Sequence, residues 1–402
     1  MRTHEDHVSA SARTTMWRAQ LKRVVIKGGV TLALLGAVVA YFALTPRSQP
    51  CWPKPEGYVP ASLLTPSTLP PQEAHPKLKR PITLLLGGDL MLGRGITRSL
   101  QRSAGYHPFY GLDAPTPVDL VHVNLESVIS ALHPEWPWKA YRFRMPPEFL
   151  PRALKLTGRN VRKAQLAVSL ANNHSLDFGV AGLKDTLLAL KQQGVSVAGA
   201  GHNASEAWAP ALLTVQGQRV GLLSITDHCG CLDMCGWLAT TTRPGVAYAY
   251  LSGGEWGPLI EATRRLRATS EVVILSLHSG PNYLDQVPEW QRALAHALIE
   301  AGATIVLMHS AHHVLPMERY KEGLIFYALG DLLNDYSVNP RYRNDLGATA
   351  LVTLHPKAEP QVALRPHALK RRARYPLSPE SPDGRLTLSR LNALSPPEER
   401  LP

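Results

Sequence analysis

Short apolar runs that end in glycine or in a polar side chain recur along the chain. The first run covers residues 82–86 and leads into Gly87, Gly88 and Asp89. A continuous apolar run of this length is typical of a strand that is covered on both faces. The glycines allow the backbone to turn or a ligand to approach closely. Asp89 is therefore expected just past the carboxyl end of the strand, where open α/β sheets bind their ligands.

The same pattern predicts most of the remaining secondary structure. Further strands are expected at residues 118–124, 165–171, 195–198, 211–215, 219–226, 271–277, 304–308, 324–329, 348–354 and 361–365. Leucines at helical spacing precede Gly194, and residues 288–301 have helical character and end at Gly302. Strands that alternate with helices predict one α/β domain, and the late strands, with few helices between them, predict a mixed or second sheet.

The N-terminal segment has a different pattern. Residues 28–44 carry no charge, and with the apolar residues 24–26 they approach the roughly 20 residues of a membrane-spanning helix. Basic residues precede this segment and none follows until Arg47, which places the N-terminus in the cytoplasm. A cleaved signal peptide is the alternative. In either case the rest of the chain is expected outside the cytoplasm, and the anchored form predicts a single-pass protein of the cell (inner) membrane with a periplasmic domain.

These patterns divide the chain into five predicted parts. They are a cytoplasmic basic tail (1–23), a transmembrane anchor (24–46), a proline-rich extended linker (47–80), a globular domain (81–367) and a basic, proline-rich tail (368–402). Weak order is expected in the last part, with one short helix at 386–394. The net charge of +12 raises the possibility of a nucleic-acid partner. Because the basic residues concentrate at the two ends and no nucleic-acid-binding motif accompanies them, that partner is not expected.

The four cysteines fit a compartment outside the cytoplasm. They are Cys51, Cys229, Cys231 and Cys235. An even number of cysteines favours disulfides in such a compartment. His228 beside the cluster also permits a zinc site, although C-x-C-x3-C is not a standard finger spacing. The pairing of the cysteines stays open.

Polar side chains follow five of the predicted strands. They are Asp89, Glu126, Asn173 with His174, His278, and His309 with His312. Each alone is typical of a cap or turn, but together they are predicted at one edge of a sheet. Oxygen and imidazole ligands suit Mn, Fe or Zn better than Mg or Ca, and the absence of thiolates argues against a structural zinc site. A bridging carboxylate can hold two metals roughly 3.5–4 Å apart and so activate water for attack on phosphoryl groups. One or two divalent transition-metal ions are therefore expected.

Several motifs resemble one family. They are GGDLMLGR (87–94), VNLES (123–127), LANNHSLDFGVAGLKDTL (170–187), LSLHSG (275–280), MHSAHH (308–313) and FYALGDLLNDY (326–336). In order and spacing they resemble the CapA family, which is associated with poly-γ-glutamate capsule synthesis and belongs to the calcineurin-like metallophosphoesterase superfamily. The resemblance spans residues 81–355. It implies an α/β/β/α sandwich of two sheets with metals at the carboxyl ends of the strands.

The resemblance also implies roles for individual residues. One metal would be held by Asp89, Glu126 and His312, and the other by Glu126, Asn173, His278 and His309. His174 matches a general acid or transition-state stabiliser. Met91 departs from the superfamily pattern, because it stands where the first strand would supply a histidine. One ligand of the first metal is therefore missing.

Basic side chains near these motifs suit an anionic substrate. Arg94, Arg142 and Arg144 are expected to bind it, since guanidinium groups match carboxylate or phosphate. Asp331 and Asp335 are expected to have structural or supporting roles.

Two functions are compatible with these features. One is a membrane-anchored, extracytoplasmic metal-dependent hydrolase or transferase that acts on a phosphoester or on an anionic capsule polymer. The other is a non-catalytic anchored scaffold or export subunit that works with other membrane-bound capsule synthesis proteins. The retained carboxylates and histidines favour the enzyme, and Met91 favours the scaffold.

Overall fold

The computed structural model describes residues 76–136, 139–228, 234–395 and 401. The predicted anchor and nearly all of the predicted linker lie outside these residues, as do Cys51, Cys229, Cys231 and the side chain of Cys235. Among the described helices, none has the length and apolar character needed to span a bilayer.

The first sheet has eight strands and mixes parallel and antiparallel pairs. Its order is β18 (Ala373–Pro376), β17 (Ala358–Lys370), β16 (Leu346–His355), β1 (Ile82–Leu90), β2 (Leu120–Leu125), β5 (Gln165–Ser169) and β6 (Ser196–Ala198), with β15 (Asp331–Leu333) also paired to β1. From β1 to β6 the strands are parallel, and β16 to β18 are antiparallel. The parallel half places the carboxyl ends of its strands at one edge.

The second sheet has six strands. Its order is β13 (Val314–Tyr320), β14 (Gly323–Leu329), β12 (Ile305–His309), β11 (Val272–His278), β9 (Gln218–Thr226) and β8 (Ala211–Val215). Two short pairs complete the described strands: β7 (Ala200–Gly201) with β10 (Gly245–Val246), and β3 (Val128–Ile129) with β4 (Arg144–Met145). In the centre, β9, β11, β12 and β14 are parallel.

A hydrophobic core lies between the two sheets. Leu84 and Leu86 of β1 belong to this core together with Ile274 of β11 and Ile305 of β12. Leu85 belongs instead to the core on the helix-covered face of the first sheet. Because side chains alternate along a strand, this arrangement covers β1 on both faces, as its continuous apolar run predicted.

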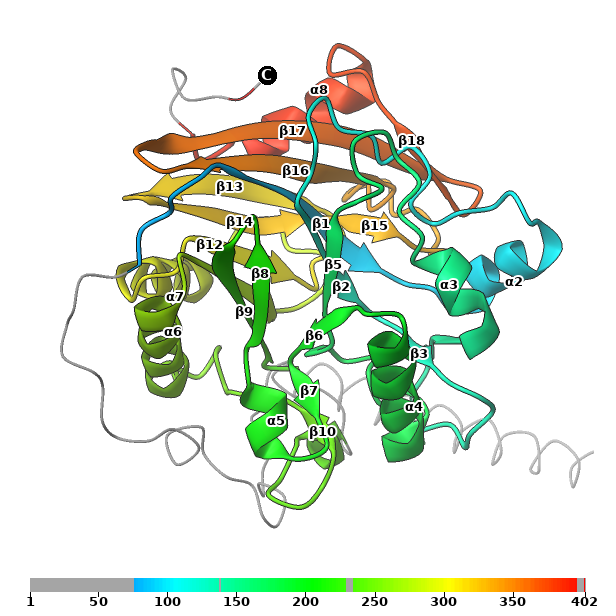
Figure 1. Cartoon of the computed structure of the whole chain (residues 1–402). Helices are drawn as coiled ribbons and strands as arrows, with labels where there is room; N and C mark the ends of the chain where they lie inside the picture. The colour runs from blue at the N-terminus through cyan, green and yellow to red at the C-terminus, as the bar shows by residue number, and fades with distance from the viewer. Residues whose placement is uncertain (1–75, 137–138, 229–233, 396–400, 402) are drawn as a thin grey trace, which may run out of the picture. The chain divides into compact units, whose positions relative to one another are not determined.

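Helices cover the outer face of each sheet (Figure 1). On the first sheet lie α2 (Arg94–Arg102), α3 (Leu150–Ala153) and α4 (Gly179–Gln192), and on the second lie α5 (Ala204–Trp208), α6 (Gly257–Thr269) and α7 (Glu289–Glu300). Two single 3₁₀ turns, η2 (Pro147–Phe149) and η3 (Met234–Trp237), lie in loops. The prediction of an α/β fold is confirmed, and its layers run helices, sheet, sheet, helices.

The C-terminal region differs from the prediction. The last long strand continues past residue 367 to Lys370, and β18 pairs with it. Helix α8 (Pro382–Leu391) then buries Leu388 and Leu391 in the core between the sheets. Residues 368–395 therefore pack with the domain instead of forming a weakly ordered tail, and the short helix expected at 386–394 overlaps α8. The basic and proline-rich composition of this region hid its packing against the core.

Glu318 of β13 is the centre of a polar network on the second sheet. Its carboxylate accepts hydrogen bonds from Arg292 (3.2 and 3.1 Å), Tyr327 Oη (2.8 Å) and His296 Nε2 (2.9 Å). Burial raises the pKa of Glu318, but these hydrogen bonds outweigh burial and lower the pKa below its ordinary value. The carboxylate therefore stabilises the fold above the pKa of the unfolded chain, and this contribution disappears as the pH falls through the folded pKa.

We expect Glu318→Gln to lower the free energy of unfolding by about 1–3 kcal/mol at pH 7, because charged hydrogen bonds are lost. The difference from the wild type should shrink as the pH falls below the ordinary glutamate pKa of 4.5. Urea unfolding at neutral and acidic pH measures both effects, with the exposed Glu148→Gln as the control. A constant difference across that range would contradict this account of Glu318.

Candidate metal centre

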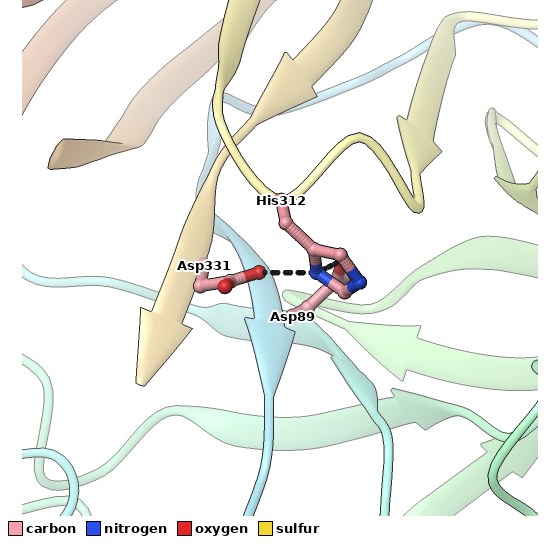
Figure 2. Close-up of side chains that lie close together, drawn as sticks. All are labelled: Asp89, His312 and Asp331. Carbon is pink, nitrogen blue, oxygen red and sulfur yellow. Dashed lines mark hydrogen bonds and ion pairs between the residues drawn. The ribbon is translucent and has the colours of Figure 1, made fainter. Parts of the chain in front are cut away.

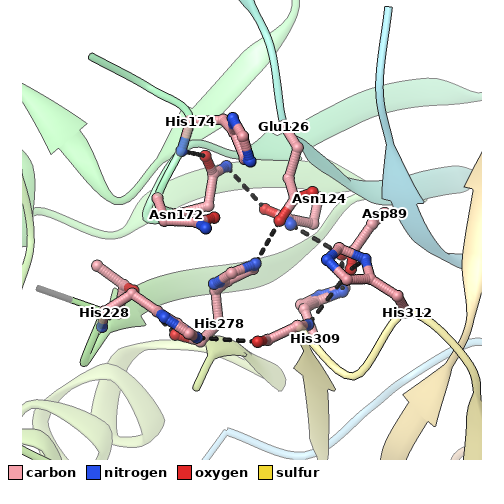
Figure 3. Close-up of polar contacts among 12 residues, drawn as sticks. Asp89, Asn124, Glu126, Asn172, His174, His228, His278, His309 and His312 are labelled. Atoms are coloured by element: carbon pink, nitrogen blue, oxygen red, sulfur yellow. Dashed lines mark hydrogen bonds and ion pairs between the residues drawn. The ribbon is translucent and has the colours of Figure 1, made fainter. Parts of the chain in front are cut away.

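Buried carboxylates and histidines meet where the carboxyl ends of both sheets converge (Figure 3). Asp89 lies near the end of β1, and Glu126 directly follows β2. From the second sheet, His278 ends β11 and His309 ends β12, and these two residues are register partners. The parallel strands thus bring together side chains that are far apart in the sequence.

Asp89 is the carboxylate that joins the two sheets. Its Oδ1 lies 3.0 Å from His309 Nδ1, and its Oδ2 lies 3.7 Å from His312 Nδ1. Asn124 of β2 donates to Oδ1 at 2.8 Å, and the Ser310 backbone N–H donates to Oδ2 at 3.2 Å. These contacts fix the orientation of the Asp89 carboxylate.

Glu126 contacts the opposite side of the centre. Its Oε1 is in hydrogen-bond contact with His278 Nε2. The other carboxylate oxygen, Oε2, is buried without a hydrogen-bond partner among the described residues, and so is His278 Nδ1. Buried polar atoms without partners are costly, and a cation held between carboxylate and imidazole would satisfy such a site.

Asp331 adds a third carboxylate (Figure 2). Its Oδ1 lies 3.0 Å from His312 Nδ1, and its backbone is the register partner of Asp89 because β15 lies beside β1. Met91, which stands where a histidine was expected, is buried and 1% exposed. Asp331 therefore offers a carboxylate oxygen beside Asp89 and His312, two of the ligands predicted for the metal that lacks this histidine.

Two overlapping groups of side chains could hold a metal ion. One is Asp89, His312 and Asp331, and the other is Asp89, Glu126 and His278. In each group the potential ligand atoms all lie within 4.8 Å of one another. Asp89 belongs to both groups, whereas the resemblance assigned the shared role to Glu126. His309 contacts Asp89 from the side and lies outside both groups.

The electrostatics of the centre fit a cation. Burial, with Asp89 adding to it, raises the pKa of Glu126 well above its ordinary value. Burial also lowers the pKa of His278, which keeps this imidazole neutral, as a metal ligand must be. For His312, burial lowers the pKa but Asp331 outweighs it and raises the pKa to about 10. Metal binding at His312 would therefore release a proton.

His174 lies beside the centre in the loop after β5. Its Nδ1 is 2.8 Å from Asp177 Oδ2 and 3.1 Å from Lys139 Nζ, and its ring packs at 4.4 Å from the Phe143 ring. Burial lowers the pKa of His174 to about 4, so the imidazole is neutral at pH 7. Asn173 precedes it, half-buried, with its Oδ1 buried and unpartnered among the described residues.

The three arginines predicted to bind substrate have different surroundings. Arg94 lies 3.4 Å from Asp335, stacks on the rings of Tyr141 and Phe143 at 5.5 Å, and keeps one buried Nη1 without a partner among the described residues.

Arg142 and Arg144 are instead bonded to nearby loops. Arg142 donates to Trp136 O and pairs with Glu135 at 3.2 Å, and Arg144 donates to Ser130 O at 3.1 Å. Arg94 is the one of the three with a buried guanidinium nitrogen that has no partner among the described residues.

Four residues of the centre were not among the predicted ligands: Asn124, Asn172, His228 and Asp331. His228 was considered only for a zinc site with the cysteines, and Asp331 only for a supporting role. Asn172, rather than Asn173, makes the hydrogen bonds in this loop, donating to Asn124 Oδ1 at 3.0 Å. The His228 ring lies 4.8 Å from the His278 ring, and its Nε2 lies 2.8 Å from Ser310 Oγ. Asp331 had a usable signal, because it follows an apolar run and a glycine as Asp89 does.

Comparisons with known proteins agree with the motifs. Residues 83–336 match the family model described as "Bacterial capsule synthesis protein PGA_cap", which is more than half of the chain. A probable polyglutamine synthesis accessory protein of Mycobacterium tuberculosis is 29% identical over 71% of this chain and 83% of its own length. The capsule biosynthesis protein CapA of Bacillus anthracis is 29% identical over 63% of this chain and 60% of its own length.

A solved structure of a hypothetical protein from Thermus thermophilus covers 74% of this chain and all of its own. At 13% identity and a TM-score of 0.39, this structure is too distant to identify the fold. The family match and the two relatives confirm the resemblance to CapA proteins. The chain therefore belongs to the bacterial capsule synthesis protein (PGA_cap) family.

Proposed function

We propose that this protein is a metal-dependent hydrolase or transferase that acts on an anionic polymer of the capsule or cell envelope, of the poly-γ-glutamate type. The observation that carries the proposal is the buried set of carboxylates and imidazoles, in which Glu126 Oε2 and His278 Nδ1 have no hydrogen-bond partner among the described residues. The layering of two sheets between helices is the arrangement implied by the metallophosphoesterase superfamily. Relatives described as capsule or polyglutamine synthesis proteins support the polymer as the substrate class.

The residues present fit one or two divalent ions of the Mn, Fe or Zn type. Asp89, His312 and Asp331 would hold one ion, and Asp89, Glu126 and His278 the other. His309, which contacts Asp89, and Asn173 belong to the ligand set predicted from the sequence but to neither of these two groups. Such ions polarise a phosphoryl or acyl oxygen and lower the pKa of water.

The remaining chemistry belongs to the protein's own side chains. Asp177 accepts from His174 Nδ1 and orients the ring, so His174 Nε2 is the atom that takes or gives a proton near the reacting bond. Lys139 contacts the same Asp177 carboxylate and limits its movement. Arg94 offers its unpartnered Nη1 to an anionic group of the substrate.

We expect His174→Gln to lower the rate of hydrolysis by about 100-fold or more, because proton transfer contributes on that order. Metal content should stay unchanged. The assay measures a generic phosphodiester and a γ-linked glutamate polymer in parallel, with added Mn or Zn. His133→Gln, on a partly exposed histidine paired with Asp185, is the matched control and should retain full activity.

Absence of hydrolysis of both substrates by metal-loaded wild type would contradict the enzyme proposal. It would favour the second candidate, a scaffold or export subunit for the polymer. The specific observation behind that candidate is the buried Met91 at the position of an expected histidine ligand. Asp331 weakens this argument, since it brings a carboxylate to the same ligand set.

The proposed site of action is outside the cytoplasm. The uncharged residues 28–44 and the preceding basic residues support a single N-terminal anchor in the cell membrane, with the domain in the periplasm or beyond. Other membrane-bound capsule synthesis proteins are the partners that such a location would bring within reach.

A further inference from the structure

Two cavities share Arg372 in their walls, and the second of them includes Tyr336, which lies beside His312 of the metal centre. The first, of about 410 Å³, is lined by Arg98, Arg102 and Arg372 among others. The second, of about 480 Å³, is lined by Arg372, Arg371 and Lys370 among others. Because Arg372 lines both cavities, we treat them as one feature and call it the basic groove.

Five cations line the basic groove. Arg98, Arg102, Lys370, Arg371 and Arg372 are all exposed, and none forms an ion pair with another described residue. Positive charges that line connected cavities attract an anionic ligand.

The carboxylates in the groove are already engaged. Asp335 lies 3.4 Å from Arg94 Nε and accepts from the Gly95 N–H at 2.8 Å. Asp345 forms two hydrogen bonds with Arg343, at 2.8 and 3.0 Å. Each carboxylate is therefore already paired with an arginine that is not one of the five exposed cations.

The backbone holds two of the arginines in an uncommon conformation. Arg371 and Arg372 form the two-residue turn between β17 and β18, with φ of 51° and 65°. Turns of this kind favour asparagine and glycine, and other residues there are strained. Arg372 also lies across the start of α2, because a Cβ at Gly95 would come within 2.4 Å of Arg372 Nε. Such strain is typical of positions whose side chains have a function.

The groove leads to the metal centre. Tyr336 lines the second cavity, and its ring lies 5.3 Å from the His312 ring. Arg98 and Arg102 of the first cavity are spaced four residues apart on α2, and Arg94, which lines neither cavity, stands at the start of this helix. Arg94 packs on the rings of Tyr141 and Phe143, so α2 carries arginines both at these rings and at the first cavity.

We propose that the basic groove binds an extended stretch of a linear polymer with repeated carboxylates and leads it to the His312 side of the metal centre. This inference rests on the proposed function for the identity of the polymer. Guanidinium groups spaced along a groove bind repeated anionic groups, whereas a single small anion would need only one of them.

Binding of labelled poly-L-glutamate to the full-length chain in detergent tests the groove. Arg98→Gln with Arg102→Gln is expected to weaken binding by about tenfold, since two exposed charge pairs are lost. The control is Lys184→Gln with Lys191→Gln, which removes the same charge from exposed positions on α4 and should change binding less than about twofold. Equal affinities for wild type and groove variant, or equal losses in both variants, would overturn the proposal.

Two further measurements distinguish failure of this proposal from failure of the proposed function. Asp89→Ala should lose metal but keep polymer binding. Polymer binding by the metal-loaded wild type without any hydrolysis would refute the enzyme and leave the groove standing. Loss of polymer binding in Asp89→Ala with retention in the groove variant refutes the groove. Single-stranded nucleic acid should bind more weakly than poly-L-glutamate, and equal groove-dependent affinity would overturn the assignment to a carboxylate polymer.

Discussion

Replacing Asp89 with alanine is expected to weaken metal binding by more than about 100-fold, because ligand and supporting residues of metal sites contribute at least on that order. Asp89 belongs to both groups of potential ligands, so its loss affects any ion at the centre. Asp331→Ala should have a smaller effect, since Asp331 belongs to one group alone. Calorimetric titration with Mn or Zn measures the affinity of each variant.

The control for Asp89 is Asp185→Ala, which removes a half-exposed carboxylate on α4. This variant should bind metal as the wild type does, and circular dichroism should show that all three variants are folded. If folded Asp89→Ala bound metal with unchanged affinity, the two proposed ligand groups would be wrong.

Replacing Gly88 with alanine is expected to lower the free energy of unfolding by more than about 3 kcal/mol, since overpacking against backbone cannot be relieved by a rotamer change. A Cβ at Gly88 would lie 1.7 Å from the Gly330 carbonyl oxygen. Strands β1 and β15 would have to separate, and Asp331 would move away from Asp89. Thermal unfolding measures the loss of stability, and metal titration of any folded protein measures the second effect.

Gly257→Ala is the matched control for Gly88. No heavy atom outside its chain neighbours lies within 4 Å of a Cβ at this position, and Gly257 begins α6. Its stability should therefore stay within about 0.5 kcal/mol of the wild type. A Gly88→Ala variant as stable as Gly257→Ala would mean that the contact between β1 and β15 is not needed for the fold.

The central strands could be predicted from the sequence because their signal is local. The apolar runs behind β1, β2, β5, β11 and β12 are each followed by a polar residue, and parallel strands place such residues at one edge. Edge strand β13 escaped prediction, since Pro316 and charged residues interrupt its apolar pattern, as edge strands tolerate.

The parts of the centre that depend on distant pairing could not be predicted. The position of Asp331 follows from the pairing of β15 with β1, which joins residues far apart in the chain. The hydrogen bonds of Asn172 likewise depend on Asn124 of a neighbouring strand. The turn formed by Arg371 and Arg372 could not be predicted for the same reason. In the sequence these arginines look like a solvated basic run, and only the pairing of β17 with β18 makes them a turn.

The central claim is that the buried carboxylates and histidines hold metal. Its most direct test is the metal content of the purified full-length chain, measured by mass spectrometry before and after titration with Mn and Zn. The account predicts one or two tightly bound ions per chain in the wild type, and loss of that metal in His278→Ala. A wild-type chain that carries no transition metal and gains none on titration would contradict it.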